Sequence, residues 1–170
     1  DTNNTIGTID ASFVTTITGL ASDINIAYAS DGITGLGNEN ITLDTPTVVA
    51  SDLNTLDNNT TGIINVDSVT TIEGLASDIN IAYASDGISK TDPLNAGTES
   101  VILSDLTVKA SDLNTLDVNT TGPIDASGVI TITGSAIDIN TAYLSSGITG
   151  LENENITLDT STVDAADLNT

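Results

Sequence analysis

The chain contains no cysteine and no histidine, and each absence excludes a class of chemistry. Without cysteine there are no disulfide bonds, and without either residue there is no ordinary zinc site. Imidazole acid–base catalysis is excluded as well. Tryptophan and methionine are also missing, and the aromatic residues are three Tyr and one Phe. A packed interior must therefore be built from Ile, Leu, Val and Ala.

Basic residues are scarce, because Lys and Arg together number 2 against 24 acidic residues, for a net charge of −22. Such a surface repels nucleic acid and anionic membranes, so no nucleic-acid partner is expected. It attracts divalent cations or basic partners. No apolar run approaches the ~20 residues that span a bilayer, so no membrane span is expected either.

What the chain does contain is a tandem repeat. Asp, an aliphatic residue and Asn recur in that order six times in 170 residues. The copies are Asp23-Ile24-Asn25, Asp52-Leu53-Asn54, Asp78-Ile79-Asn80, Asp112-Leu113-Asn114, Asp138-Ile139-Asn140 and Asp167-Leu168-Asn169. They indicate one array over residues 1–170 with about six units, which begin near Ser22, Ser51, Ser77, Ser111, Ile137 and Ala166.

Two types of unit alternate, since subtracting successive start positions gives lengths of 29, 26, 34, 26 and 29 residues. The longer units, here named Tyr units, carry Asp-Ile-Asn-x-Ala-Tyr and contain Tyr28, Tyr83 or Tyr143. The shorter units, here named Leu units, carry Asp-Leu-Asn-Thr-Leu-Asp at 52–57 and 112–117. The tyrosines stand at helical spacing from the motif's isoleucine, which favours a stacked core or seam over a sugar-binding platform.

The residue pattern of each unit predicts one short helix followed by short strands. A Ser at an N-cap position, an Asp in the first turn and apolar residues at helical spacing predict the helix. A glycine nine or ten residues after the Asp, such as Gly62, predicts a left-handed turn at the helix end. Threonine and β-branched residues then predict strands of about four residues. The expected fold is an α/β solenoid with stacked parallel β-rungs, and the alternative is a pure β-solenoid.

Spacing gives a reason for two types of unit. Neighbouring strands lie ~4.8 Å apart, whereas packed helices need ~8–10 Å. A helix in every unit would force curvature. If only the Tyr units carried full helices, the helix spacing would double to ~9.6 Å and a straight rod would become possible. We therefore predict full helices in the Tyr units alone.

The two ends of the chain continue one another. Joined end to start, they read Asp-Leu-Asn-Thr-Asp-Thr-Asn-Asn-Thr-Ile-Gly, which matches residues 52–62 without a gap. We expect an array open at both ends that stacks head to tail with copies of itself, or with adjoining repeats of a longer chain. The residues expected at these self-stacking ends are Asp1, Asn3, Asn4, Ile9, Leu168, Asn169 and Thr170.

The motif asparagines are predicted to form a structural ladder, because stacked Asn side chains can bond each other and the turn backbone. Its members are Asn25, Asn54, Asn80, Asn114, Asn140 and Asn169. No cofactor is required by the sequence. Calcium is the alternative, since turn carboxylates offer oxygen ligands. The candidate ligands are Asp31, Asp57, Asp86 and Asp117.

The run Ala-Ser-Asp-Leu-Asn-Thr-Leu-Asp-x-Asn-Thr-Thr-Gly at 50–62 and 110–122 is followed by Thr-Ile-x-Gly at 71–74 and Thr-Ile-Thr-Gly at 131–134, a tetrapeptide also found at 16–19. Over essentially the whole chain, this pattern resembles repeats of giant bacterial secreted or cell-surface proteins, often cyanobacterial, of hemolysin-like or adhesin type. The resemblance implies an extracellular structural or adhesive role and supplies no catalytic residues. The glycine-rich calcium nonapeptide of such proteins is missing.

These observations predict a structural protein that forms an extracellular or cell-surface filament, sheath or surface layer. The alternative is a calcium-dependent adhesin stalk or a carbohydrate-binding surface module. An enzyme is not expected, because no carboxylate stands in an apolar context that would shift its pKa.

Overall fold

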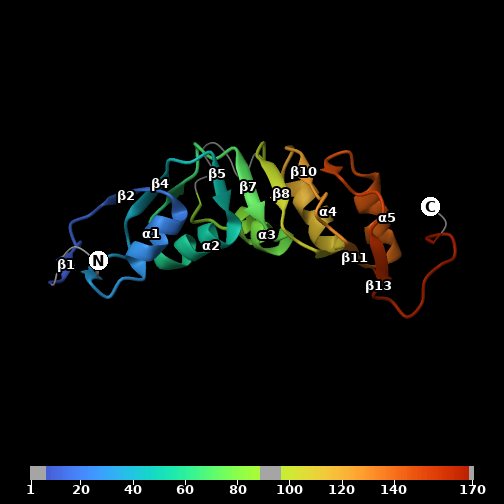
Figure 1. The fold of residues 1–170 in the computed structure, drawn as a ribbon, viewed down its shortest axis with the longest axis horizontal. Coiled ribbons are helices and arrows are strands. Elements are labelled where there is room, and N and C mark those ends of the chain that lie inside the picture. Colours follow the sequence, from blue (N-terminus) through green and yellow to red (C-terminus); the bar gives the residue numbers. More distant parts are fainter. Residues whose placement is uncertain (1–6, 89–96, 169–170) are drawn as a thin grey trace.

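The computed structural model describes residues 7–88 and 97–168, which form an elongated arch with the two chain ends at opposite tips (Figure 1). Within the described residues, short helices alternate with short strands. The helices are α1 (Ala21–Tyr28), α2 (Ala50–Asn59), α3 (Ala76–Ala84), α4 (Ala110–Asn119) and α5 (Ala136–Leu144). Each described helix packs against the next one along the chain.

The strands are two to four residues long, and every strand pair is parallel. They are β1 (Ile9–Asp10), β2 (Thr16–Gly19), β3 (Ile33–Thr34), β4 (Asn40–Leu43), β5 (Thr47–Val49), β6 (Ile64–Asn65), β7 (Thr71–Gly74), β8 (Ser100–Leu103), β9 (Thr107–Lys109), β10 (Ile124–Asp125), β11 (Thr131–Gly134), β12 (Ile148–Thr149) and β13 (Asn155–Leu158). An α/β repeat fold with parallel sheets is thus confirmed, and the helices exclude the all-β alternative.

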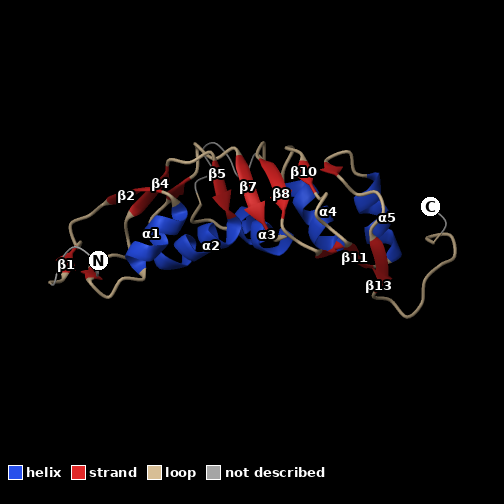
Figure 2. Ribbon diagram, viewed as in Figure 1, coloured by secondary structure: helices blue, strands red, loops and turns tan. Residues whose placement is uncertain are grey.

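The strands do not all lie at one height along the arch. In Figure 2 the strands β5, β7, β8 and β10 lie along the upper edge, whereas β11 and β13 lie lower, near α5. The helices have only two or three turns, too few to be stable alone. They are held by one buried face: Ala50, Leu53 and Leu56 of α2 are fully buried, whereas Ser51 and Thr55 are exposed.

The core consists almost entirely of Ile, Leu, Val and Ala, as the composition predicts. The motif aliphatics of the five helices and the aliphatics of the predicted strand runs lie in one continuous buried cluster. These residues are Ile24, Leu53, Ile79, Leu113 and Ile139, together with Ile64, Val69, Ile72, Ile124, Val129 and Ile132. The cluster passes through the units of all five described helices, so each of these units buries apolar surface against its neighbours.

The predicted serine N-caps are wrong by two residues. Ser22, Ser51, Ser77 and Ser111 are each the second residue of a helix. The preceding N-cap residues are extended and make no side-chain capping bond; they are Leu20, Val49, Leu75 and Lys109. The reason is that a strand runs almost directly into each helix. Only α5, among the described helices, has a serine cap, in which Asp138 N donates to Ser135 Oγ.

The predicted left-handed glycine at the helix end is also wrong, since Gly62 and Gly122 do not have positive φ. A different constraint requires glycine at both positions. A Cβ on Gly62 would overlap the backbone oxygen of Glu39, and a Cβ on Gly122 would overlap that of Glu99. Glycine is needed there because two successive units approach backbone to backbone.

The alternation between unit types lies in the strands and not in the helices. Helices of both types have eight to ten residues, so the prediction of full helices in Tyr units alone is wrong. In the first Tyr unit the helix is followed by the three strands β3, β4 and β5, and in the first Leu unit by the two strands β6 and β7.

The additional strand shifts each sheet sideways. The two strands of a Leu unit pair with the second and third strands of the Tyr unit before it, as β6 does with β4 and β7 with β5. They pair with the first and second strands of the Tyr unit after it, as β10 does with β12 and β11 with β13. The complete sheet β5-β7-β8-β10-β12 therefore begins just before a helix and ends just after one.

This shift reconciles the two spacings. Across two units the helices need ~16–20 Å, whereas two strand steps give only ~10 Å. A four-residue strand is ~13 Å long, and adding it at right angles to those two steps gives ~16 Å. The additional strand of a Tyr unit thus provides the remaining displacement, and every unit can keep both a helix and paired strands.

Candidate assembly interface

Five motif asparagines link each helix to the next element. Each side-chain amide donates to the backbone oxygen of the motif Asp one unit later, at 2.9–3.0 Å. The donors are Asn25, Asn54, Asn80, Asn114 and Asn140, and the acceptors are Asp52, Asp78, Asp112, Asp138 and Asp167. The sixth predicted member, Asn169, lies outside the described residues.

The ladder is possible because a backbone oxygen has two acceptor positions, one for its own helix and one for the asparagine. Asp and Asn stand two residues apart in the motif, so one helix offers the oxygen towards the preceding unit and the amide towards the following unit. The same pair of residues therefore makes both connections, and the pattern can repeat without limit.

A second hydrogen bond differs between the two kinds of interface. Where a Leu helix follows a Tyr helix, its terminal Asn donates to the ladder: Asn59 to Asn25 Oδ1, and Asn119 to Asn80 Oδ1. Where a Tyr helix follows, Ser85 occupies the corresponding position and donates to Asp57 Oδ2 at 2.8 Å. The two interfaces are chemically different, so the order of unit types is specified.

The four calcium candidates are placed in two settings. Asp57 accepts from Ser85, and Asp117 lies beside Gly147, each at an interface between units. Asp31 and Asp86 lie in exposed turns directly after a Tyr helix. Within residues 7–88 and 97–168, no three His, Cys, Asp or Glu residues gather in an arrangement that could hold a metal ion.

Each Tyr unit contains a Tyr–Glu pair that the sequence reasoning missed. The hydroxyls of Tyr28, Tyr83 and Tyr143 donate to Oε2 of Glu39, Glu99 and Glu154, at 2.8, 3.5 and 2.6 Å. A signal was present in the sequence, because Glu39 and Glu154 both follow their tyrosine by 11 residues. Tyr83 is buried in the core and Tyr28 packs against it, and each of the three tyrosines also holds a carboxylate.

The first pair is closed by the following Leu unit. Glu39 is fully buried, and its carboxylate also accepts from Gly37 N at 2.9 Å. Thr60, at the end of α2, donates through its hydroxyl to the backbone oxygen of Glu39 at 2.7 Å. Thr120 makes the same contact with Glu99 at 3.0 Å.

These contacts shift the pKa values of both partners. The pKa of Tyr28 is raised to about 12, mainly by burial and also by the hydrogen bond to Glu39. Burial also opposes ionisation of Glu39, but hydrogen bonds from Gly37 and the Tyr28 hydroxyl outweigh it, so the pKa of Glu39 is lowered. The ion therefore stays charged and the phenol stays neutral over a wide pH range.

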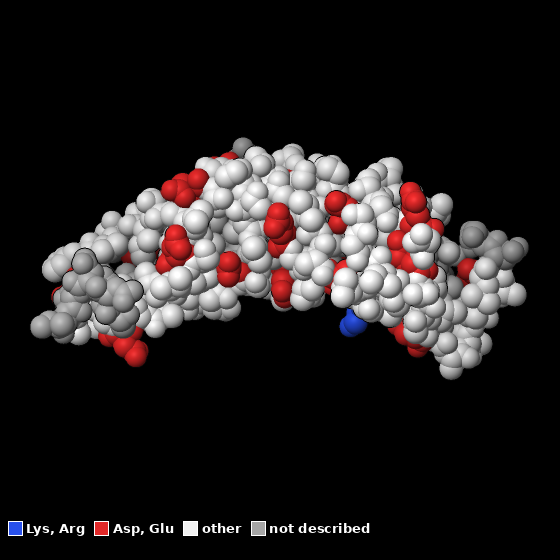
Figure 3. Space-filling view, viewed as in Figure 1, with Lys and Arg blue, Asp and Glu red and all other residues white. Residues whose placement is uncertain are grey.

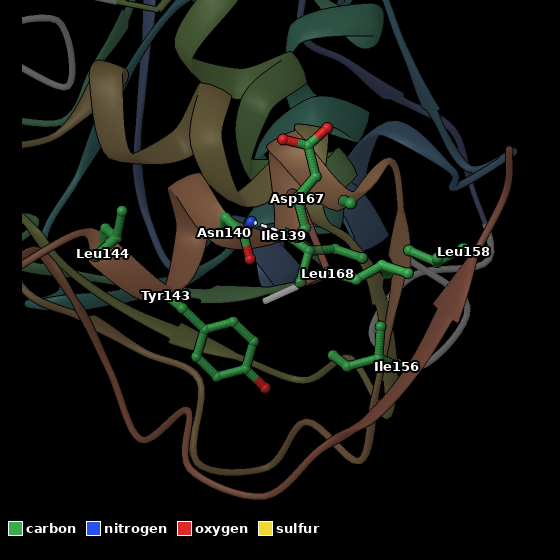
Figure 4. Close-up of a pocket in the computed structure, with 9 residues that line it drawn as sticks. Ile139, Asn140, Tyr143, Leu144, Ile156, Leu158, Asp167 and Leu168 are labelled. Carbon is green, nitrogen blue, oxygen red and sulfur yellow. Dashed lines mark hydrogen bonds between the residues drawn. The ribbon is translucent and has the colours of Figure 1, made fainter. Parts of the chain in front are cut away.

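A pocket of about 400 Å³ opens on the far side of α5 (Figure 4). In this view the side chains of Tyr143, Ile156 and Leu168 border the same space. The equivalent residues of the first Tyr unit and the Leu unit after it are Tyr28, Ile41 and Leu53; the last two are fully buried. The pocket is thus the uncovered counterpart of an interior interface.

The residues predicted at the self-stacking ends are only partly described. Ile9 lies in β1 and is 40% exposed, and Leu168 borders the pocket and is 59% exposed. Asp1, Asn3, Asn4, Asn169 and Thr170 lie outside the described residues. In place of a sixth helix, Ala165–Leu168 forms a turn, and Asp167 joins the ladder through its backbone oxygen.

Comparisons with known proteins do not place the chain in a family. No family model, curated protein or solved structure matches it. The resemblance to repeats of giant bacterial surface proteins therefore stays a prediction.

Charge is spread over the visible surface and does not gather in one site. Figure 3 shows acidic side chains at intervals along the arch, with far less basic surface. None of the described helices is both long enough and apolar enough to cross a membrane.

Proposed function

We propose that the chain is a structural repeat segment, a solenoid whose units stack continuously with further units to build an extracellular filament, sheath or surface layer. Further units come from copies of the chain or from adjoining repeats of a longer one. The observation that carries the proposal is the pocket beside α5: Ile156 and Leu168 are 46% and 59% exposed, whereas the interior counterparts Ile41 and Leu53 are fully buried.

The ladder supports the same proposal. Each of the four interior units, those of α2 to α5, presents a motif oxygen to the unit before it and an asparagine amide to the unit after it. An interface built in this way uses the same residues at every step, as expected of an array that grows by translation. A head-to-tail contact produces filaments when its rotation does not close into a ring.

The test is electron microscopy and sedimentation of the purified chain over a range of concentrations. We expect filaments that dissociate on dilution. Leu168→Asp should prevent them by placing a charge on the open face, whereas Leu106→Asp, at an exposed leucine in the middle of the array, should leave them intact. Filaments that form equally well with Leu168→Asp would refute the proposal.

Calcium is separated from simple charge screening by the same assay. Copies that each carry −22 repel one another, so salt should promote assembly. We expect sodium chloride at matched ionic strength to replace calcium and a chelator to have no further effect. Filaments that require calcium specifically, and dissolve on chelation, would instead support the calcium-dependent adhesin stalk.

A further inference from the structure

The outer edge of β13 is the last strand edge of the array in the described residues. β13 is the second strand of its Tyr unit, as β4 is in the first. In the middle Tyr unit the first strand position is held by Ile88, which forms an isolated parallel bridge with Ile64, and β8 takes the second position. Both β4 and β8 are paired on two sides, β4 with β2 and β6, and β8 with β7 and β10. β13 is paired with β11 alone among the described strands.

The strand that pairs with this edge inside the array is always the first strand of a Leu unit. Ile64 of β6 lies opposite Ile41 of β4, and Ile124 of β10 lies opposite Val101 of β8. Backbone bonds fix the register, since Ile41 N donates to Ile63 O, and Val101 N to Pro123 O, both at 2.9 Å. Ile156 of β13 occupies the position of Ile41.

The other end of the molecule presents a strand of this type. β1 precedes β2 and α1 as β6 precedes β7 and α3, and Ile9 occupies the position of Ile64. Among described strands β1 pairs with β3 only. Ile9 is 40% exposed and Ile156 46% exposed, whereas both Ile64 and Ile41 are fully buried. The two ends are thus exposed at complementary positions.

We propose that β13 receives β1 of a second copy as a parallel strand, with Ile9 opposite Ile156 and Asp10 opposite Thr157. This joint rests on the proposed function, because it specifies how stacked copies meet. The joint repeats the β4–β6 pairing, in which Asn65 lies opposite Thr42. It also places the two strands of a Leu unit after a Tyr unit, as β6 follows β4 and β10 follows β8 inside the array. β1 thereby becomes the continuation of the sheet β9-β11-β13.

The joint is tested by cysteine cross-linking, for which the cysteine-free chain is a clean background. The double variant D10C with T157C places two thiols on neighbouring strands at ~4.8 Å, within the Cα separation that a disulfide bridges. Oxidation of assembled protein should give a ladder of covalent oligomers on a denaturing gel. The matched control combines F13C with T157C and is three residues out of register; it should give no such ladder. Circular dichroism and a thermal unfolding curve verify that each variant folds as the parent does.

Each outcome separates the joint from the proposed function. Filaments with a ladder for D10C and T157C, and none for the control, support the joint. Filaments without that ladder, or with an equal ladder for the control, overturn the joint and leave head-to-tail stacking in place. Failure of the parent chain to self-associate at any concentration overturns the joint together with the stacking of separate copies, and leaves adjoining repeats of a longer chain as the source of further units.

Discussion

Leu168 offers the most direct test of stacking, because an interior leucine serves as its internal standard. Leu168 and Leu113 occupy the same motif position in two Leu units, but Leu113 is fully buried and Leu168 is 59% exposed. Truncating a buried Leu to Ala costs ~2–5 kcal/mol. Leu113→Ala should therefore lower the unfolding temperature of the dispersed chain by ~4–20 °C, at ~2–4 °C per kcal/mol for a chain of this size.

Leu168→Ala should have the reverse effects, with little change in the unfolding temperature of the single chain and a large change in assembly. Little of that side chain is buried in the single chain, so its unfolding temperature should change little. On stacking, the exposed 59% of the side chain becomes buried, which makes ~1–3 kcal/mol of the interior cost depend on the joint. Since 1.4 kcal/mol is a factor of ten, the critical concentration for assembly should rise roughly 5- to 150-fold.

The assay is sedimentation of filaments against total protein concentration, with thermal unfolding followed by circular dichroism below the critical concentration. An unchanged critical concentration for Leu168→Ala would refute the equivalence of the open face and the interior interfaces. So would a fall in unfolding temperature as large as that of Leu113→Ala, because Leu168 would then be a core residue of the single chain.

Three further predictions concern contacts inside the array. Asn114→Ala removes one bond of the ladder and should cost about 1 kcal/mol of unfolding free energy in chemical denaturation, whereas Asn58→Ala, at an exposed position, should cost nearly nothing. Gly122→Ala should cost about 1–3 kcal/mol by overpacking, whereas Gly128→Ala, where a Cβ meets only ordinary contacts, should be close to neutral; equal costs would show that close approach is not the constraint. The raised pKa of Tyr28, about 12, means that stability is complete below pH ~10 and is lost as pH rises towards 12, and the lowered pKa of its glutamate partner means that stability is lost as pH falls below about 4.5. Tyr28→Phe should flatten both limbs of the stability profile, and an unchanged profile would assign the pH dependence to other groups.

Much of the fold could be predicted from the repeat, because its residues obey a local period. In each unit the motif aliphatic, such as Ile24 or Leu53, stands at helical spacing from the other apolar residues of its helix. The buried face of each helix could therefore be read from the sequence. Short runs of threonine and β-branched residues, such as that of β4, were likewise readable as strands. Both features depend only on which face of a segment is apolar, and sequence records that directly.

The lateral shift of the sheets could not be read in this way. Motif positions repeat every 26 to 34 residues, but paired strands are mostly 23 or 24 residues apart, as Ile41 and Ile64 are. The difference arises because a strand of one unit pairs with a strand of different rank in the next. Pairing of this kind depends on three-dimensional spacing between helices, and no local pattern encodes it.

Helix ends were mispredicted for a related reason. Ser51 has the side chain of an N-cap, but the preceding strand β5 leads into the helix at Ala50 and fixes the cap at Val49. Tertiary geometry overrode a local preference worth about 1 kcal/mol. The Tyr28–Glu39 pair was missed because neither residue is unusual alone, and only their constant separation in the outer Tyr units marks them.

Because the sheet β5-β7-β8-β10-β12 begins and ends inside the arch, tension applied along the axis cannot be carried from tip to tip by one set of strands. The tension has to pass from one sheet to the next through the units that contribute strands to both sheets. β4, for example, lies in β2-β4-β6 while its own unit contributes β5 to the next sheet. Opening this five-stranded sheet therefore affects the five units that supply its strands, and the neighbouring sheets still connect the units on either side.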